Sequence, residues 1–99
     1  MIIEQAVLNV IPAKTAEFEV ALQRALPLIS TSAGFQGLEI RRNAQVRHQY
    51  LLLVRWDSVE HHTEGFRKSD RYLKWKDLLH GFYDPFPEVS HFEEVVALV

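Results

Sequence analysis

Apolar side chains dominate residues 2–11 and lie on both faces of the strand that this segment predicts. Successive residues of a β-strand point to opposite sides of the sheet, so the alternation can be followed face by face. One face carries Ile3, Val7 and Ile11, and the other carries Ala6, Leu8 and Val10. Aliphatic and β-branched residues favour a strand, which Pro12 ends. We therefore expect this strand to be covered on both sides.

From about Ala13 the apolar period lengthens from two residues to between three and four. The apolar positions are Phe18, Leu22, Ala25 and Ile29. Together they form one stripe of an amphipathic helix. Pro27 lies inside this helix and should bend its last turn, because proline has no amide hydrogen for the carbonyl four residues back. Gly34 ends the connection that follows.

Two further strands are predicted over Gly37–Arg42 and Tyr50–Trp56, with a polar turn at Asn43–Arg47 between them. They should pair as a hairpin. In the second of these strands Leu51 and Leu53 point to one side. The apolar residues of the other side are Tyr50, Leu52, Val54 and Trp56. A strand that is apolar on both sides is typical of the centre of a sheet.

The second helical region is predicted in two pieces. Asp57 and Glu60 form a capping-box pattern at the start of the first piece, and Ser69 is the expected N-cap of the second. The first piece carries His61, His62, Gly65 and Phe66. The apolar stripe of the second, which runs to about Gly81, consists of Tyr72, Trp75, Leu78 or Leu79, and Phe82. The prolines of Asp84–Pro87 disfavour helix, and a last strand is predicted over Val89–Val99.

The resulting order, β-α-β-β-α-β, predicts an α+β fold of the ferredoxin-like type. Such a fold has a four-stranded antiparallel sheet with its helices on one face. The opposite face then keeps apolar side chains, and a large open apolar surface is rare on a monomer. The simplest cover is a second copy of the chain packed sheet on sheet, so we expect a homodimer.

Composition narrows the class of protein. The chain has 99 residues, of which 47% are hydrophobic and 24% charged, and this size and composition predict one globular domain over residues 1–99. Cysteine is absent, which excludes disulfides and thiolate chemistry. The net charge is −2 and the basic residues are scattered along the chain, so nucleic acid is not expected as a partner. Without an apolar run of about 20 residues or a signal-like start, we expect a soluble, cytoplasmic protein with no membrane partner.

Candidate chemistry centres on two histidines. His62 and Phe66 are four residues apart, so they should share one wall of a pocket. A histidine that titrates near neutrality could take a proton from a phenol or enol there; the alternative is that His62 only caps or packs. His91 lies on the last strand, where it could orient a substrate or form a structural hydrogen bond. Adjacent His61 and His62 diverge on a helix, so no metal site is expected.

Aromatic and basic residues supply candidate substrate contacts. The rings of Tyr72, Trp75, Phe82 and Tyr83 could stack against a flat aromatic molecule, or they could be ordinary core. Arg41 ends a strand and could hold an oxyanion or carboxylate, although solvated charge is the more common role of such a residue. Motifs for nucleotide binding and for serine hydrolases are missing from the sequence.

A family resemblance is carried by two long segments of the chain. The first is ISTSAGFQGLEIRR at residues 29–42, and the second is residues 50–95, which begin with YLLLVRWDSVEHHTEGFRKSD. A helix ends in small residues before Gly-Phe, a strand ends in Trp, and a helix with His and Phe-x-x-Ser follows. In this order and spacing the chain resembles the antibiotic biosynthesis monooxygenase family of dimeric α+β barrels. The resemblance implies a homodimer with a pocket between sheet and helices in each subunit.

The resemblance leaves the activity open, because family members differ in chemistry. A haem-degrading branch has Asn, Trp and His at the positions that here are Ala6, Phe66 and Lys76, so haem degradation is not expected. A cofactor-independent branch, which forms quinones with molecular oxygen, has a Trp–Tyr pair where this chain has Phe66 and Tyr72. The leading hypothesis is therefore a cofactor-independent monooxygenase with a small aromatic or quinol-like substrate. The alternatives are a non-catalytic dimeric binding domain for a hydrophobic molecule and a haem binder that uses a different histidine.

Overall fold

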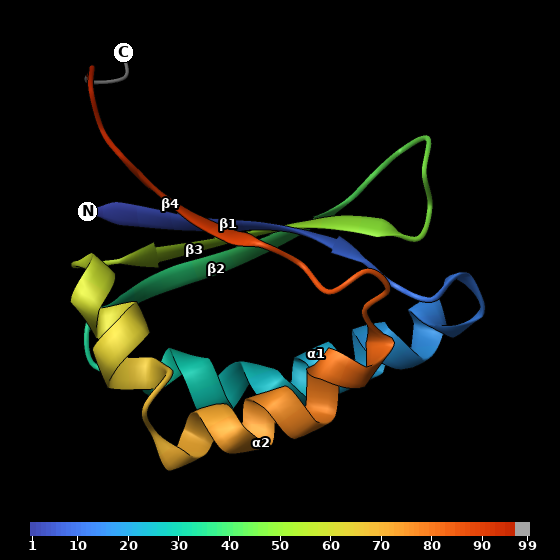
Figure 1. Ribbon diagram of the computed structural model, residues 1–99, viewed down its shortest axis with the longest axis horizontal. Coiled ribbons are helices and arrows are strands. Elements are labelled where there is room, and N and C mark those ends of the chain that lie inside the picture. The colour runs from blue at the N-terminus through green and yellow to red at the C-terminus, as the bar shows by residue number, and fades with distance from the viewer. Residues whose placement is uncertain (97–99) are drawn as a thin grey trace.

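The computed structural model describes residues 1–96, and its sheet and helices form two layers (Figure 1). The strands are β1 (Ile2–Asn9), β2 (Phe35–Arg42), β3 (Gln49–Trp56) and β4 (Val89–Glu93). The long helices are α1 (Thr15–Ser30) and α2 (Asp70–Leu79). Three short helical segments complete the fold: η1 (Pro12–Lys14), η2 (His61–Phe66) and η3 (His80–Phe82).

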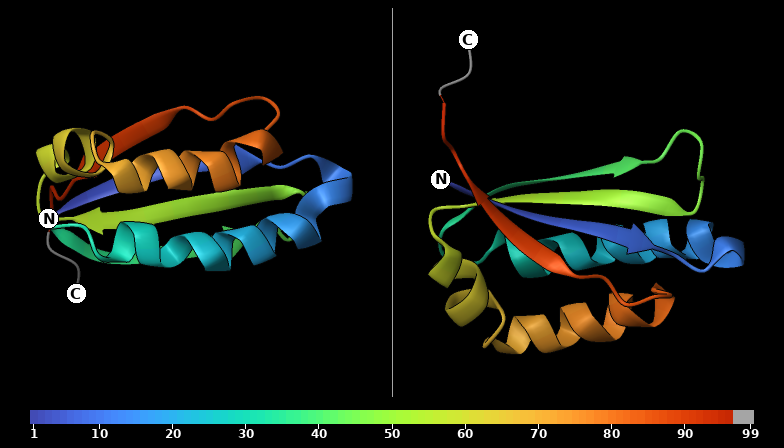
Figure 2. Two further views of the ribbon diagram at one scale, coloured as in Figure 1. Left: turned by 90° about the horizontal axis from the view of Figure 1, so that it is seen from below. Right: turned by 45° about the horizontal axis from the view of Figure 1, so that its top comes forward.

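The four strands form one antiparallel sheet in the order β2-β3-β1-β4. Both α1 and α2 lie side by side on the same face of it, which the view from below in Figure 2 shows directly. The predicted ferredoxin-like α+β fold is therefore confirmed. None of the helices in residues 1–96 has the length and apolar character needed to cross a membrane.

The helix α1 follows its sequence pattern closely. Its buried residues are Phe18, Leu22, Ala25 and Ile29, the predicted stripe. Pro27 lies inside the helix as predicted. At the loop before β2, Gly34 has a φ of 80°, and a Cβ there would lie 2.3 Å from the ring of His61. Glycine thus lets the start of η2 pack directly against this loop.

Two predicted boundaries are wrong. At the second helical region Ser58, not Asp57, accepts from the first turn, with its Oγ 3.3 Å from the amide nitrogen of His61. Asp57 instead accepts a hydrogen bond from Gln36. The last strand is predicted over Val89–Val99 but ends at Glu93. Residues 97–99 of that prediction lie outside the described residues. The N-cap at Ser69 is confirmed, because its side chain accepts from the amide of Tyr72.

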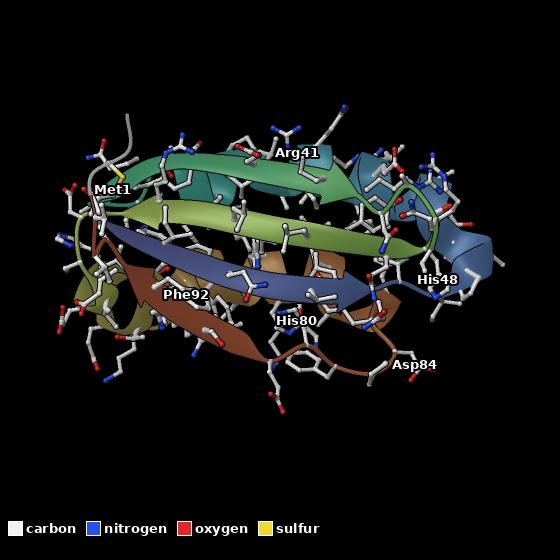
Figure 3. The ribbon with its side chains drawn as sticks, turned by 90° about the horizontal axis from the view of Figure 1, so that it is seen from above. Met1, Arg41, His48, His80, Asp84 and Phe92 are labelled. Carbon is white, nitrogen blue, oxygen red and sulfur yellow. The ribbon has the colours of Figure 1, made fainter. Side chains whose placement is uncertain are left out.

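The alternation in the two central strands divides the sheet into a covered and an open face. On β3 the even-numbered residues from Tyr50 to Trp56 are buried against the helices, while the odd-numbered residues between them are partly exposed. On β1 the same division buries Ala6 and Leu8 and leaves Val7 39% exposed. Figure 3 looks onto the open face, with Arg41 on β2 and Phe92 on β4. The prediction of apolar residues on both faces is thus confirmed.

Candidate functional site

A cavity of about 70 Å³ lies between the sheet and the second helical region. The small side chain of Ala6 on β1 and the side chain of Leu52 on β3 form part of its floor. Aromatic rings from the helical region form the opposite wall, namely Phe66, Tyr72 and Trp75. The cavity thus lies where the sequence predicts a pocket, between the sheet and the helices.

Phe66 is the centre of the aromatic wall. Its ring is 1% exposed and stands edge-on to Tyr72 at 5.5 Å and to Trp75 at 5.7 Å between ring centroids. Edge-to-face contacts of this kind fix the orientation of each ring. The wall therefore presents a rigid apolar surface to whatever occupies the cavity.

A carboxylic acid, Glu4 on β1, lines the cavity on the sheet side and is only 5% exposed. The indole Nε1–H of Trp56 donates to its Oε1 over 2.9 Å. Burial raises the pKa of Glu4, an effect that the Trp56 hydrogen bond and the charge of Arg67 only partly offset. A raised pKa extends the pH range in which the carboxyl group is protonated, and in that form it can also donate a hydrogen bond.

His62 lies beside Glu4 and is held by a local departure from the α-helix. The segment η2 is a π-helix, in which the amide of Arg67 bonds to the carbonyl of His62 five residues back. Such segments often occur at functional sites. The His62 ring stacks on the indole of Trp56, with centroids 5.5 Å apart and planes 19° from parallel. Both His62 and Phe66 are buried and line the cavity.

Both ring nitrogens of His62 face polar partners. Its Nδ1 lies 2.8 Å from Nε2 of His91, and its Nε2 lies 3.4 Å from Oε1 of Glu4. Burial, and then the charges of Arg67 and His91, lower the pKa of His62 to about 3. The expectation of a histidine that titrates near neutrality is therefore wrong, and the Glu4–His62 contact is not an ion pair, because the imidazole is uncharged.

His91 reaches this cluster from the neighbouring strand. Residues Glu4 and His91 are directly opposite each other where β1 pairs with β4, so both side chains leave the same face of the sheet. His91 does not line the cavity and is partly exposed. Its own pKa is lowered by partial burial and by Arg67.

The cavity reaches the surface near Phe86, which lines it and is 61% exposed. The Phe86 ring packs against His80, at 4.9 Å between centroids, and against Tyr83, at 6.2 Å. Burial raises the pKa of Tyr83 and lowers that of His80. Arg67 is exposed, also lines the cavity, and forms no ion pair within residues 1–96. The mouth thus combines aromatic rings with one positive charge.

The structure brings most of the candidate residues together. Five of them line the cavity, namely His62, Phe66, Tyr72, Trp75 and Tyr83. His91 does not line the cavity but is hydrogen-bonded to His62. The other two lie elsewhere. Phe82 packs on Phe18, at 5.8 Å between ring centroids, and does not line the cavity. Arg41 lies on β2 at the open face and pairs with Glu39 over 2.7 Å (Figure 3).

Glu4 is the site residue that the sequence interpretation missed. A signal for it exists, because Glu4 is in phase with Ala6, Leu8 and Val10 on the covered face of the first strand. A carboxylate in the middle of a core-facing pattern is expensive to bury and therefore marks a specific environment.

A two-layer fold with an aromatic cavity and a buried acid and histidine defines the class as a small α+β protein with an interlayer pocket. Residues 1–78 match the model of the family described as antibiotic biosynthesis monooxygenase. The chain therefore belongs to the antibiotic biosynthesis monooxygenase family.

Individual relatives agree with this assignment. The uncharacterized protein YczJ of Bacillus subtilis (strain 168) is 45% identical over 95 residues, which cover 96% of this chain and 100% of that protein. A crystal structure from Bordetella bronchiseptica, assigned to antibiotic biosynthesis monooxygenases, is 30% identical with a TM-score of 0.90 and covers 96% of this chain and 97% of that one.

A third relative shares the fold alone. A variant of SnoaB, a cofactor-independent oxygenase from Streptomyces nogalater, has a TM-score of 0.84 at 18% identity. The match covers 98% of this chain and 95% of the other chain.

Within residues 1–96 of the present chain, no three histidine or acidic side chains gather as a metal site.

Proposed function

We propose that this protein is a cofactor-independent monooxygenase whose cavity takes a small aromatic or quinol-like compound. The observation that carries the proposal is the meeting of an aromatic wall with a buried proton-accepting cluster in one cavity. Stacking surfaces are supplied by Phe66, Trp75 and Tyr83. The polar groups that would face the reacting molecule are those of Tyr72 and His62, and His91 reaches the cavity only through its hydrogen bond to His62. Phe82 and Arg41 lie away from the cavity and have no role in it. The SnoaB likeness supports oxygen chemistry by analogy of fold.

The proposed chemistry needs molecular oxygen as its only co-substrate. A phenol that loses its O–H proton becomes an electron-rich anion able to reduce oxygen. In a balanced conversion to a quinone, one oxygen atom becomes the new ring carbonyl. The other oxygen atom leaves as water with the O–H and ring C–H hydrogens of the substrate. The phenol is oxidised by four electrons and the oxygen molecule is reduced by four, so no flavin or metal is required by the balance.

The size of the cavity limits the substrate. An apolar cavity of about 150 Å³ admits benzene, about twice the volume available here. A bound ring must therefore displace side chains, and we expect Phe86, the exposed aromatic ring of the lining, to move. Haem, many times larger than benzene, fits this cavity still less well. The proposal is thus for a single-ring substrate and an opening at Phe86.

The proposal includes a homodimer in which a second copy covers the open face of the sheet. Partly exposed apolar residues line this face in the centre of the sheet, namely Ile3, Val7, Leu51 and Leu53. Proteins of this family are typically dimeric, and burial of apolar surface contributes about 25 cal/mol per Å² to association. We expect light scattering to give twice the 11.5 kDa of one chain at micromolar concentration. A mass of one chain would contradict this part of the proposal.

Oxygen uptake tests the enzymatic role. A panel of single-ring phenols and hydroquinones should consume oxygen faster with the protein than without it. Removal of a residue that handles the proton typically costs 10²–10⁴-fold, so His62→Ala should lower the rate at least about a hundredfold. His48→Ala, which changes a partly exposed histidine away from the cavity, is the matched control and should leave the rate unchanged.

A non-catalytic binding domain is the second candidate, favoured by the small volume of the cavity. In that case a phenol should bind, as measured by calorimetry, and Phe66→Trp should weaken it by filling the cavity, yet no phenol or hydroquinone in the panel should raise oxygen uptake. Binding without turnover would therefore replace the enzymatic proposal with this one.

A further inference from the structure

We propose that Glu4, His62 and His91 form a proton path from the cavity to solvent, in which Glu4 takes the proton of the bound molecule. This inference rests on the proposed function, since it needs a molecule with an ionisable O–H in the cavity. It adds Glu4, a residue that the comparisons do not address, as the catalytic base and makes His62 and His91 the route by which the proton leaves.

The inner end of the path is the free oxygen of Glu4. Its Oε1 accepts from Trp56 and faces His62, whereas Oε2 makes no hydrogen bond within residues 1–96. Glu4 lines the cavity, so Oε2 is the oxygen available to an occupant. Both nitrogens of His62, by contrast, already face protein atoms. Glu4 is therefore better placed than His62 to receive a proton from a bound molecule.

The middle of the path is the His62 ring, fixed by its stacking on Trp56. The 2.8 Å separation from His91 is a full hydrogen bond. The 3.4 Å separation from Glu4 is longer and must close by a few tenths of an ångström when proton transfer occurs. Catalytic hydrogen bonds are often long before the substrate binds. A neutral imidazole suits this position, because it donates from one nitrogen and accepts at the other.

The outer end of the path is His91, on the edge strand β4. It is partly exposed and does not line the cavity, so it connects the buried pair with the outside. Its position is fixed by the register that places it opposite Glu4. Three residues from three separate segments therefore form one continuous line from the cavity to the surface.

The proton balance of the path is simple when all three groups start neutral. Glu4 begins protonated on Oε1, and His62 and His91 each begin protonated on Nδ1. As the substrate O–H proton reaches Oε2, the Oε1 proton passes to Nε2 of His62, and the Nδ1 proton of His62 passes to Nε2 of His91. His91 then releases its own Nδ1 proton to water. One proton enters, one leaves, and no group on the path changes charge.

The surroundings favour neutral groups along this path. Burial, and then the charge of Arg67, lower the pKa values of His62 and His91, and Arg67 would also stabilise an anion formed in the cavity that it lines. The other titratable groups that line the cavity beside Glu4 come from α2, η3 and the segment after it, and are Tyr72, His80 and Tyr83. None of these three contacts His91 in a hydrogen bond within residues 1–96.

Histidine tautomers test the path without any need for turnover. Long-range ¹H–¹⁵N NMR spectra of the ¹⁵N-histidine-labelled protein should show neutral His62 protonated on Nδ1 at pH 7. In Glu4→Gln, the Trp56 indole N–H should hold the amide oxygen at the position of Oε1, and because this oxygen can only accept, His62 should switch to the Nε2–H form. Wild-type His62 already protonated on Nε2, with no change in Glu4→Gln, would overturn the path.

Kinetics test the outer end separately. If a phenol is turned over, Glu4→Gln should lower kcat about a hundredfold with KM changed less than threefold. His91→Ala should lower kcat about tenfold, and added imidazole should restore it, which a merely structural role would not allow. Loss without rescue would remove His91 from the path. If no phenol is turned over, the proposed function fails, while the tautomer switch still decides whether the path exists.

Discussion

The covered and open faces of the sheet differ in chemistry although the same strands build both. On the covered face the central strands carry large aromatic residues and one acid, Tyr50, Trp56 and Glu4. On the open face they carry aliphatic residues of similar size, such as Leu51 and Leu53. Adjacent residues of one strand thus serve two different surroundings, because the pleat sends them to opposite sides.

The difference teaches where specificity has to be built. The covered face must fix a few polar groups inside an apolar layer, so Glu4 and His62 each have a defined partner at a defined distance. As the proposed dimer interface, the open face needs only shape and apolar area, for which aliphatic side chains suffice. Substitutions should therefore have different consequences on the two faces, and matched pairs of variants can distinguish them.

The largest expected effect follows truncation on the covered side. Phe66→Ala removes a fully buried ring that contacts Tyr72 and Trp75, and such truncations cost about 3–5 kcal/mol. Phe86→Ala removes an exposed ring and should cost less than about 1 kcal/mol. Urea unfolding followed by circular dichroism measures both. Equal losses would mean that the aromatic wall is not the rigid part of the molecule.

A charge on the open face should break the proposed homodimer and leave the subunit folded. Leu51→Glu places a carboxylate opposite Val7 in the centre of this face. Burying that charge against a partner should weaken dimerisation at least about a hundredfold, equivalent to about 3 kcal/mol. The matched control is Leu73→Glu, on the exposed side of α2. Analytical ultracentrifugation distinguishes them, and an unchanged Leu51→Glu dimer would place the interface elsewhere.

The sequence predicts the two faces well because strand alternation is a local property. The apolar stripe of α1 and the N-cap at Ser69 are local in the same sense, and both are confirmed. The antiparallel sheet and its helices follow from the order of these elements. Glu4 also carries a visible signal, since its position is in phase with the buried residues of β1.

The polar cluster itself could not be predicted, because it depends on contacts between distant segments. His62 and His91 are 29 residues apart and meet only because β4 pairs with β1 next to Glu4. The π-helical geometry of η2 has no clear pattern in the sequence, although it sets the direction of His62. The low pKa of His62 arises from this packing, so the position of His62 in the sequence does not indicate it.

Acid sensitivity should report the buried histidine of the covered face. An unfolded chain binds a proton at His62 near pH 6.5, whereas the folded protein resists protonation until about pH 3. Because the unfolded state binds more protons in this window, this contribution to stability is complete above pH 6.5 and decreases as the pH falls. We expect a slope of about 1 kcal/mol per pH unit.

Glu4 acts in the opposite sense, so the pH range has to be chosen with care. Its raised pKa makes stability fall as the pH rises above 4.5, and the effect of His62 is therefore clearest between pH 4.5 and 3. There the stability of His62→Gln should fall less steeply with decreasing pH than that of His48→Gln, which changes a partly exposed histidine away from the cavity. Thermal unfolding at each pH measures the stability of both variants. If their stabilities depend on pH with the same slope, His62 is not held neutral in the folded protein.

The smallest expected effect distinguishes the arginines of the two faces by ligand binding. Arg67 lines the mouth of the cavity on the covered side, whereas Arg41 lies on the open side and pairs with Glu39. An exposed charge contributes about 0.2–1 kcal/mol to such a contact. Arg67→Ala should therefore weaken the binding of 4-hydroxybenzoate about 1.4- to fivefold in calorimetry, and Arg41→Ala should leave it unchanged. The reverse result would move the anion contact to the open face and would end the division between a face for ligand and a face for the partner subunit.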